Sequence, residues 1–119
     1  MTTYGRVVAA MDLILSTATA GELTVVSVTG EIDMYTAPQL RGYLTELLAE
    51  GVTRLAIDVN GVDFCDSTGL GVFIGTLRRL REVGGSLIIV CAREQMLKIF
   101  QLTGLQKVFD IRPQLPTDG

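Results

Sequence analysis

The sequence contains no histidine, and its 119 residues include only two cysteines, Cys65 and Cys91. The two thiols are far apart in the chain and show no CxxC spacing, so the sequence offers no ligand set for a metal ion. The absence of histidine also removes the usual general base of a nucleophilic serine. We therefore expect two buried, reduced thiols, no metal or other cofactor, and a protein that is not an enzyme.

Long apolar runs and an excess of basic charge are absent as well. No stretch reaches the ~18 apolar residues of a membrane-spanning helix, and the N-terminal residues lack the pattern of a signal peptide. The net charge is −3, which provides no basic face for nucleic acid. Neither phosphate-binding glycine motif, GxxxxGKS/T or GxGxxG, occurs. The sequence predicts a cytoplasmic protein that binds neither membranes nor nucleic acid directly.

Hydrophobic residues make up 48% of the chain, which is enough to build the core of one domain. Alternating and helical apolar patterns predict an α/β fold with a mixed, mostly parallel sheet of four to five strands and three to four helices, because single helices separate most strands. Strands are expected at 13–18, 23–29, 54–59, 86–91 and 108–111, and helices at 36–50, 66–83 and 94–103. The domain is expected to span 12–112, between flexible tails at 1–11 and 113–119.

One strand-to-helix loop, residues 60–71, carries most of the residues suited to function. In one interpretation Asp66 or Ser67 caps the following helix, and Gly69 and Gly71 permit close packing. In a second, Ser67 or Thr68 accepts a phosphate, which a helix N-terminus stabilises by ~1 kcal/mol. Its charge beside Asp66 would repel a partner fitted to the hydroxyl. A catalytic serine is a third interpretation, disfavoured by the missing histidine and the lack of SxxK spacing.

The heptapeptide DSTGLGV at 66–72 resembles the signature of the sulfate transporter and anti-sigma antagonist (STAS) domain family, in its stand-alone bacterial form. Four further segments are similar to the family and follow in its order: 29–37, 54–59, 84–90 and 102–105. The likeness extends over roughly residues 12–111. It implies a STAS-like fold for the whole domain.

The resemblance also implies the role of an anti-sigma factor antagonist. In its unphosphorylated form such a protein binds an anti-sigma factor that is also a serine kinase, and so releases the sigma factor. Phosphorylation of the serine directly after the aspartate, here Ser67, ends the binding, and a metal-dependent phosphatase restores it. Thr68 is the second choice of acceptor. The alternative is a STAS adaptor without a kinase cycle, in a lipid-transport ATPase or a stressosome-like scaffold.

The residues expected to bind the partner lie on two loops. The resemblance places residues 31–35 near the phosphorylation site, although the same residues also suit a solvated turn. Leu70 equally suits packing of its helix. The expected partner-binding residues are Glu31, Asp33, Tyr35, Asp66, Ser67, Thr68, Gly69 and Leu70.

Overall fold

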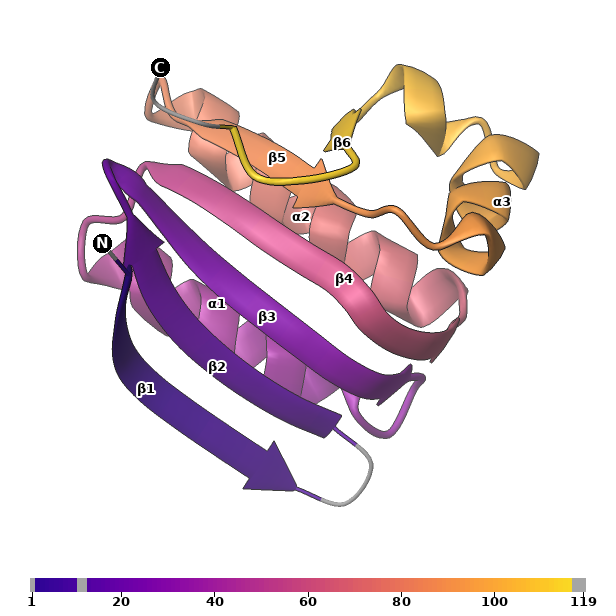
Figure 1. Ribbon diagram of the computed structural model, residues 1–119, viewed down its shortest axis with the longest axis horizontal. Helices are drawn as coiled ribbons and strands as arrows, with labels where there is room; N and C mark the ends of the chain where they lie inside the picture. Colours follow the sequence, from indigo (N-terminus) through magenta and orange to yellow (C-terminus); the bar gives the residue numbers. More distant parts are fainter. Residues whose placement is uncertain (1, 11–12, 117–119) are drawn as a thin grey trace.

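The computed structural model describes residues 2–10 and 13–116, through which a six-stranded sheet runs in chain order, β1 to β6 (Figure 1). The first two neighbouring pairs are antiparallel, and the remaining three are parallel. Antiparallel neighbours can be joined by short turns, whereas parallel strands need longer crossovers. The strands are β1 (Thr2–Ala10), β2 (Leu13–Ala20), β3 (Leu23–Ile32), β4 (Arg54–Cys65), β5 (Ser86–Val90) and β6 (Asp110–Arg112).

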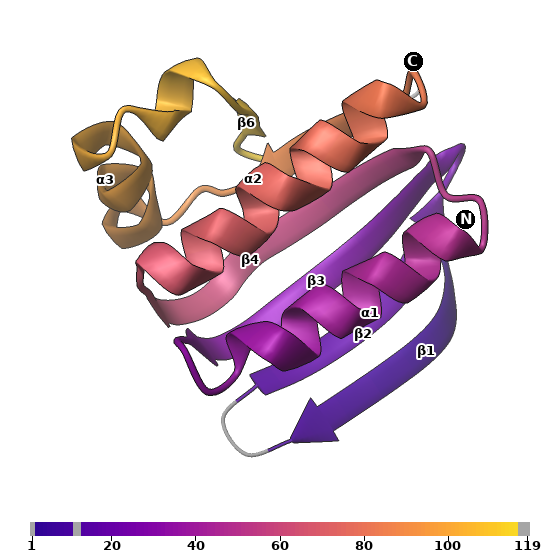
Figure 2. The same ribbon diagram turned by 180° about the vertical axis from the view of Figure 1, so that it is seen from behind.

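Helices α1 (Ala37–Ala49) and α2 (Ser67–Glu82) form two of these crossovers. They lie side by side on one face of the sheet, because successive right-handed crossovers in one direction place their helices on the same face (Figure 2). Helix α3 (Glu94–Leu102) and the 3-10 turn η1 (Leu105–Lys107) lie together at one corner. Across the described residues, no helix is long and apolar enough to span a membrane.

The main core fills the space between the sheet and these helices. The helical spacing of Leu40, Tyr43, Leu44 and Leu47 is confirmed as the buried face of α1. From α2, Phe73 is fully buried. One polar pair lies in this core, where the hydroxyls of Thr17 and Tyr43 are hydrogen-bonded to each other. Each buried hydroxyl thereby has a partner, which avoids the cost of an unsatisfied polar group.

The N-terminal segment differs from its prediction. A flexible tail was expected at 1–11, but Thr2–Ala10 is strand β1 and pairs along β2. This strand makes the edge of the sheet and moves β2 into its interior, so the described sheet has six strands instead of four to five. The α/β class, the mixed and mostly parallel pairing and the helix count are confirmed. Met1 and residues 11–12 lie outside the described residues.

Strand β4 is longer than its prediction. Asn60-Gly61 was expected to end the strand after residue 59, yet β4 continues to Cys65 alongside β3. The register shifts near Gly61, which lies opposite Thr29. A Cβ at Gly61 would come within 2.6 Å of Oγ1 of Thr29. This glycine therefore allows a close approach of two strands, and the extended strand ends directly before Asp66.

A second apolar cluster lies on the sheet face that α1 and α2 leave open (Figure 1). Its buried members come from β3, β4 and β5, and Leu115 packs against them. Residues 113–116, expected to belong to a flexible tail, thus include a side chain that covers this face. Residues 117–119 lie outside the described part of the chain. The buried members are Leu23, Val25, Ala56, Ile88 and Val90.

Candidate functional site

Asp66 caps helix α2 and joins it to the sheet. Its Oδ1 accepts hydrogen bonds from the backbone N–H groups of Thr68, at 2.9 Å, and Gly69, at 3.1 Å. Its own backbone N–H donates to the carbonyl of Ile32 at the end of β3, at 3.1 Å. The carboxylate therefore satisfies two of the first-turn donors that an uncapped helix leaves free.

Ser67 is the first residue of α2, and its side chain is exposed. Its hydroxyl has no hydrogen-bond partner in the described chain, and Thr68 is half-buried. Because Asp66 already accepts from the next two amides, the N–H of Ser67 is the first-turn donor left without an acceptor among the described residues. A phosphate on Ser67 would meet one free amide and a neighbouring carboxylate, so its charge would be poorly compensated.

The loop between β3 and α1 is held by its own hydrogen bonds. Oδ1 of Asp33 accepts from the N–H groups of Tyr35, at 2.9 Å, and Thr36, at 3.0 Å. Thr36 directly precedes α1, but its hydroxyl donates to the carbonyl of Glu31 at 2.8 Å and makes no cap. These bonds hold the loop in a turn that exposes Met34 and Tyr35, the latter with 82% of its side-chain surface accessible.

The two loops lie next to each other because β3 and β4 are parallel and end together. Glu31 pairs with Phe64 and Ile32 with Cys65 in the sheet register. The structure thus brings most of the predicted partner-binding residues to one end of the sheet, together with exposed Met34 of the loop expected near the phosphorylation site, and adds exposed Phe64 to them. We call this set the Ser67 surface; it comprises Glu31, Asp33, Met34, Tyr35, Phe64, Asp66, Ser67 and Thr68.

Two predicted contact residues do not lie on that surface. Gly69 is buried, and a Cβ there would lie 2.5 Å from Cγ2 of Ile32 and 2.7 Å from Sγ of Cys65. Leu70 is also buried, at 6% exposure, in the core. The prediction that they touch a partner is corrected, because both pack α2 against the sheet. Gly71 was also expected to permit close packing, and this is wrong: it is exposed, and a Cβ there would meet no atom of the described residues within 4 Å.

Arg93 supports the end of β4 and was not singled out by the sequence patterns. Strand β5 pairs with β4 only as far as Asp58. Beyond that point, Nη1 of Arg93 donates to the carbonyls of Asn60 and Val62, each at 3.1 Å, and forms an ion pair with Asp63 at 3.4 Å. One guanidinium thus fixes the segment that leads into the Ser67 surface. An isolated arginine in a loop gave no pattern that could have identified it.

Replacing Asp66 with alanine is expected to lower the free energy of unfolding by about 1 kcal/mol, because two amide donors of α2 lose their acceptor. Urea denaturation followed by circular dichroism measures this change. Asp66→Asn is the matched control, since asparagine caps helices about as well as aspartate and lacks the charge. Equal losses in both variants would show that the charge, and not the cap, stabilises the helix.

The cysteines are confirmed as free and buried. Burial, together with the charge of Asp66, raises the pKa of the Cys65 thiol to about 12. The thiol titrates near pH 9 when unfolded, so its contribution to stability is complete below pH 9 and is lost as the pH rises toward 12. In a Cys91→Ser variant at pH 8, we expect Cys65 to react with a thiol reagent only after denaturant is added. Rapid labelling of the native variant would contradict this.

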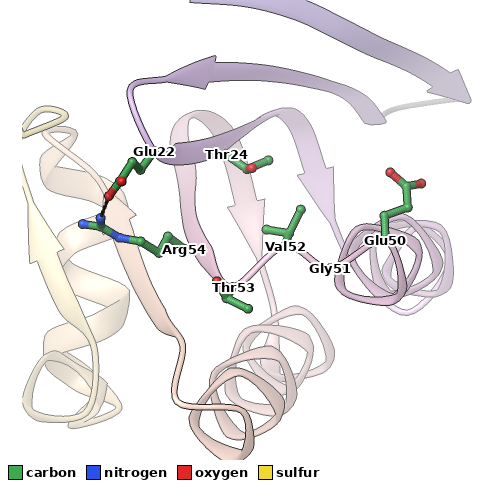
Figure 3. Close-up of a pocket in the computed structure, with 7 residues that line it drawn as sticks. All are labelled: Glu22, Thr24, Glu50, Gly51, Val52, Thr53 and Arg54. Atoms are coloured by element: carbon green, nitrogen blue, oxygen red, sulfur yellow. Dashed lines mark hydrogen bonds and ion pairs between the residues drawn. The ribbon is translucent and has the colours of Figure 1, made fainter.

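A cavity of about 550 Å³ lies at the opposite end of the sheet from Ser67 (Figure 3). Arg54 points toward Glu22 there and forms an ion pair with it, and both side chains are more than half exposed. Arg54 and Glu22 therefore neutralise each other at the surface. Across the described residues, no group of three His, Cys, Asp or Glu side chains could hold a metal ion. The lining residues are Glu22, Thr24, Glu50, Gly51, Val52, Thr53 and Arg54.

Comparison with known proteins gives matches over most of the chain. The STAS domain family matches residues 15–117. The anti-sigma-B factor antagonist of Bacillus subtilis is 43% identical over 86 residues, which cover 72% of this chain and 78% of that protein. The crystal structure of an anti-sigma factor antagonist from Mycobacterium paratuberculosis has a TM-score of 0.74 at 32% identity and covers 87% of both chains. The Bacillus cell fate determinant SpoIIAA in its phosphorylated form has a TM-score of 0.64 at 25% identity, covering 84% of this chain and 92% of that one.

Proposed function

This chain belongs to the STAS domain family, and from that membership we propose that it is an anti-sigma factor antagonist switched by phosphorylation of Ser67. Its unphosphorylated form binds an anti-sigma factor that is also a serine kinase, and the sigma factor is thereby released. The names of its relatives support the antagonist role, and a related protein is known in a phosphorylated form. The kinase and the opposing metal-dependent phosphatase are parts of this proposal.

The observation that carries the proposal is the hydroxyl of Ser67 at the start of α2, which is exposed and makes no hydrogen bond to any other described residue. A kinase can reach Oγ of Ser67 without unfolding the helix. The hydroxyl makes no hydrogen bond to other described residues, so none has to break when the kinase binds it. At the same end of the sheet, Met34 and Tyr35 supply exposed apolar area for a protein partner. Exposed aromatic residues of this kind are common at the centre of protein interfaces.

The switch itself is electrostatic. When ATP is the donor, its γ-phosphoryl group forms a bond to Oγ of Ser67, ADP leaves, and the hydroxyl proton is released. The modified residue carries nearly two negative charges. These lie beside the Asp66 carboxylate, which is already bound to two amides. A partner surface fitted to the neutral hydroxyl loses contact and meets repulsion, while hydrolysis by the phosphatase restores the binding form.

In this proposal the protein supplies an acceptor hydroxyl and a binding surface, and the kinase supplies all catalytic groups. The antagonist is therefore a regulatory binding protein and not an enzyme. Its partners act on ATP and on the transcription machinery, so the proposal places the protein in the cytoplasm. Transcription is regulated through these proteins and without direct contact to nucleic acid.

The test is intact-mass spectrometry after incubation with ATP and the candidate kinase, followed by peptide mapping. We expect one added phosphate on Ser67 and none in the Ser67→Ala variant, whereas Thr68→Val is modified like the parent chain. Phosphate on Thr68 would shift the site by one residue. No phosphate with a kinase of demonstrated activity would overturn the switch and favour a STAS adaptor without a kinase cycle.

A further inference from the structure

Basic and acidic residues are segregated along the chain. Residues 67–108 contain six basic and two acidic residues and so carry a net charge of +4, whereas the remainder contains four basic and eleven acidic residues and carries −7. The positive part comprises α2, β5, α3 and η1, which lie together in the fold (Figure 2). A protein with a net charge of −3 therefore presents a region of the opposite sign.

Within this region, a groove of about 400 Å³ lies along the second half of α2. Its apolar lining comes from Ile74 and Leu77 on the helix and from Val108 directly after η1. Val108 keeps 42% of its surface exposed, so side chains of the described residues do not fill the groove. Three charged residues complete the lining: Arg78, Arg81 and Glu82.

The two arginines of the groove are free to bind a ligand. Arg93 donates a hydrogen bond to a backbone carbonyl of β4, and Arg79 donates to Oγ1 of Thr45. By contrast, neither Arg78 nor Arg81 forms an ion pair or hydrogen bond with any described residue. A guanidinium group matches the geometry of a carboxylate and binds it with two parallel hydrogen bonds. The groove thus combines an apolar floor with two guanidinium groups that have no partner among the described residues and can each bind a carboxylate.

We propose that this groove binds an acidic amphipathic helix of a partner protein. Such a helix places apolar side chains at i, i+3 and i+4 into the groove, and its flanking carboxylates reach Arg78 and Arg81. Nucleic acid fits less well, because the apolar floor formed by Ile74, Leu77 and Val108 offers nothing to a phosphate backbone.

The groove is distinct from the Ser67 surface. Along α2, Ile74 lies seven residues after Ser67, which is about 10 Å at the rise of an α-helix, and Arg81 lies about 20 Å away. A helix bound in the groove therefore does not cover Ser67. Occupancy of the groove is independent of phosphorylation, and the protein has room for a second partner while it engages its kinase.

The probe is a 14-residue peptide with leucine at positions 3, 6, 7 and 10, glutamate at positions 2, 4, 9 and 11 on both sides of the leucine face, and alanine elsewhere, so that it favours a helix. We expect amide chemical shifts to change at Ile74, Leu77 and Val108 on titration into the isotope-labelled protein. Arg81→Glu should weaken binding at least tenfold, since it replaces an attraction with a repulsion. Arg41→Glu, the same exposed charge change on α1, is the matched control and should leave the affinity unchanged. Ser67→Asp should also bind the peptide normally.

Several results would overturn the proposal. One is the absence of shifts at millimolar peptide, and another is a set of shifts centred on the Ser67 surface. Equal weakening by Arg81→Glu and Arg41→Glu would show general charge attraction and not a site. Stronger, Arg81-dependent binding of a 12-nucleotide single-stranded DNA, or of phosphatidylglycerol vesicles, would assign the groove to nucleic acid or to a lipid surface instead.

Discussion

The Ser67→Asp variant is expected to lose affinity for the anti-sigma kinase by roughly hundredfold or more, which corresponds to about 2.7 kcal/mol. A carboxylate at the start of α2 places a second negative charge beside Asp66, in an interface fitted to a neutral hydroxyl. Ser67 is exposed and makes no bond to other described residues, so the free energy of unfolding should change by no more than about 0.5 kcal/mol. Isothermal titration calorimetry with the purified kinase measures the affinity.

Ser67→Asn is the matched control for this experiment, because asparagine has nearly the shape of aspartate and carries no charge. We expect it to retain most of the affinity that Ser67→Asp loses. If both variants lost affinity equally, the size of the side chain would explain the effect, and charge would not be the basis of the switch. Unchanged affinity in Ser67→Asp would remove Ser67 from the interface.

Gly69→Ala is expected to lower the free energy of unfolding by about 2–3 kcal/mol, as is usual when atoms are forced into a packed core. The added methyl group would lie 2.5 Å from Cγ2 of Ile32 and 2.7 Å from Sγ of Cys65, so α2 must shift away from β3 and β4. Urea denaturation measures the loss. Binding of the kinase should weaken as well, because Asp66 and Ser67 move with the start of the helix.

Gly71→Ala provides the comparison two residues further along the same helix. A Cβ at Gly71 meets no atom within 4 Å, and alanine favours the helix by up to about 1 kcal/mol over glycine. This variant should therefore be slightly more stable than the parent. A similar loss of stability in both variants would mean that close packing is not the reason why this end of α2 needs glycine, since Gly71 is not closely packed.

The sequence was informative where local pattern and tertiary structure agree. The spacing of Leu40, Leu44 and Leu47 identified the buried face of α1, and Asp66 had the residue type and position of a helix cap. The resemblance to the STAS family located Ser67 and its loop. These features depend on periodicity and short motifs, which can be recognised in a single sequence.

Features that depend on pairing across the fold were not predictable in this way. Strand β1 was expected to be a tail because its short apolar segment gains a partner only when β2 lies beside it. The sequence did not show which of its two interpretations holds for Gly69, close packing or contact with a partner, because its neighbours Ile32 and Cys65 come together only when β3 pairs with β4. Phe64 was missed for a similar reason, since the exposure of a strand residue depends on which face the helices cover.

The bonds made by Arg93 also limit how a partner can approach. Its guanidinium occupies the carbonyls of Asn60 and Val62, which a further strand beside the last part of β4 would need as acceptors. An incoming segment therefore cannot extend the sheet at this edge by main-chain pairing, a common mode of peptide recognition elsewhere. A partner that binds at this end of the sheet must therefore contact side chains, so its selectivity depends on surface residues and not on the backbone that the fold shares.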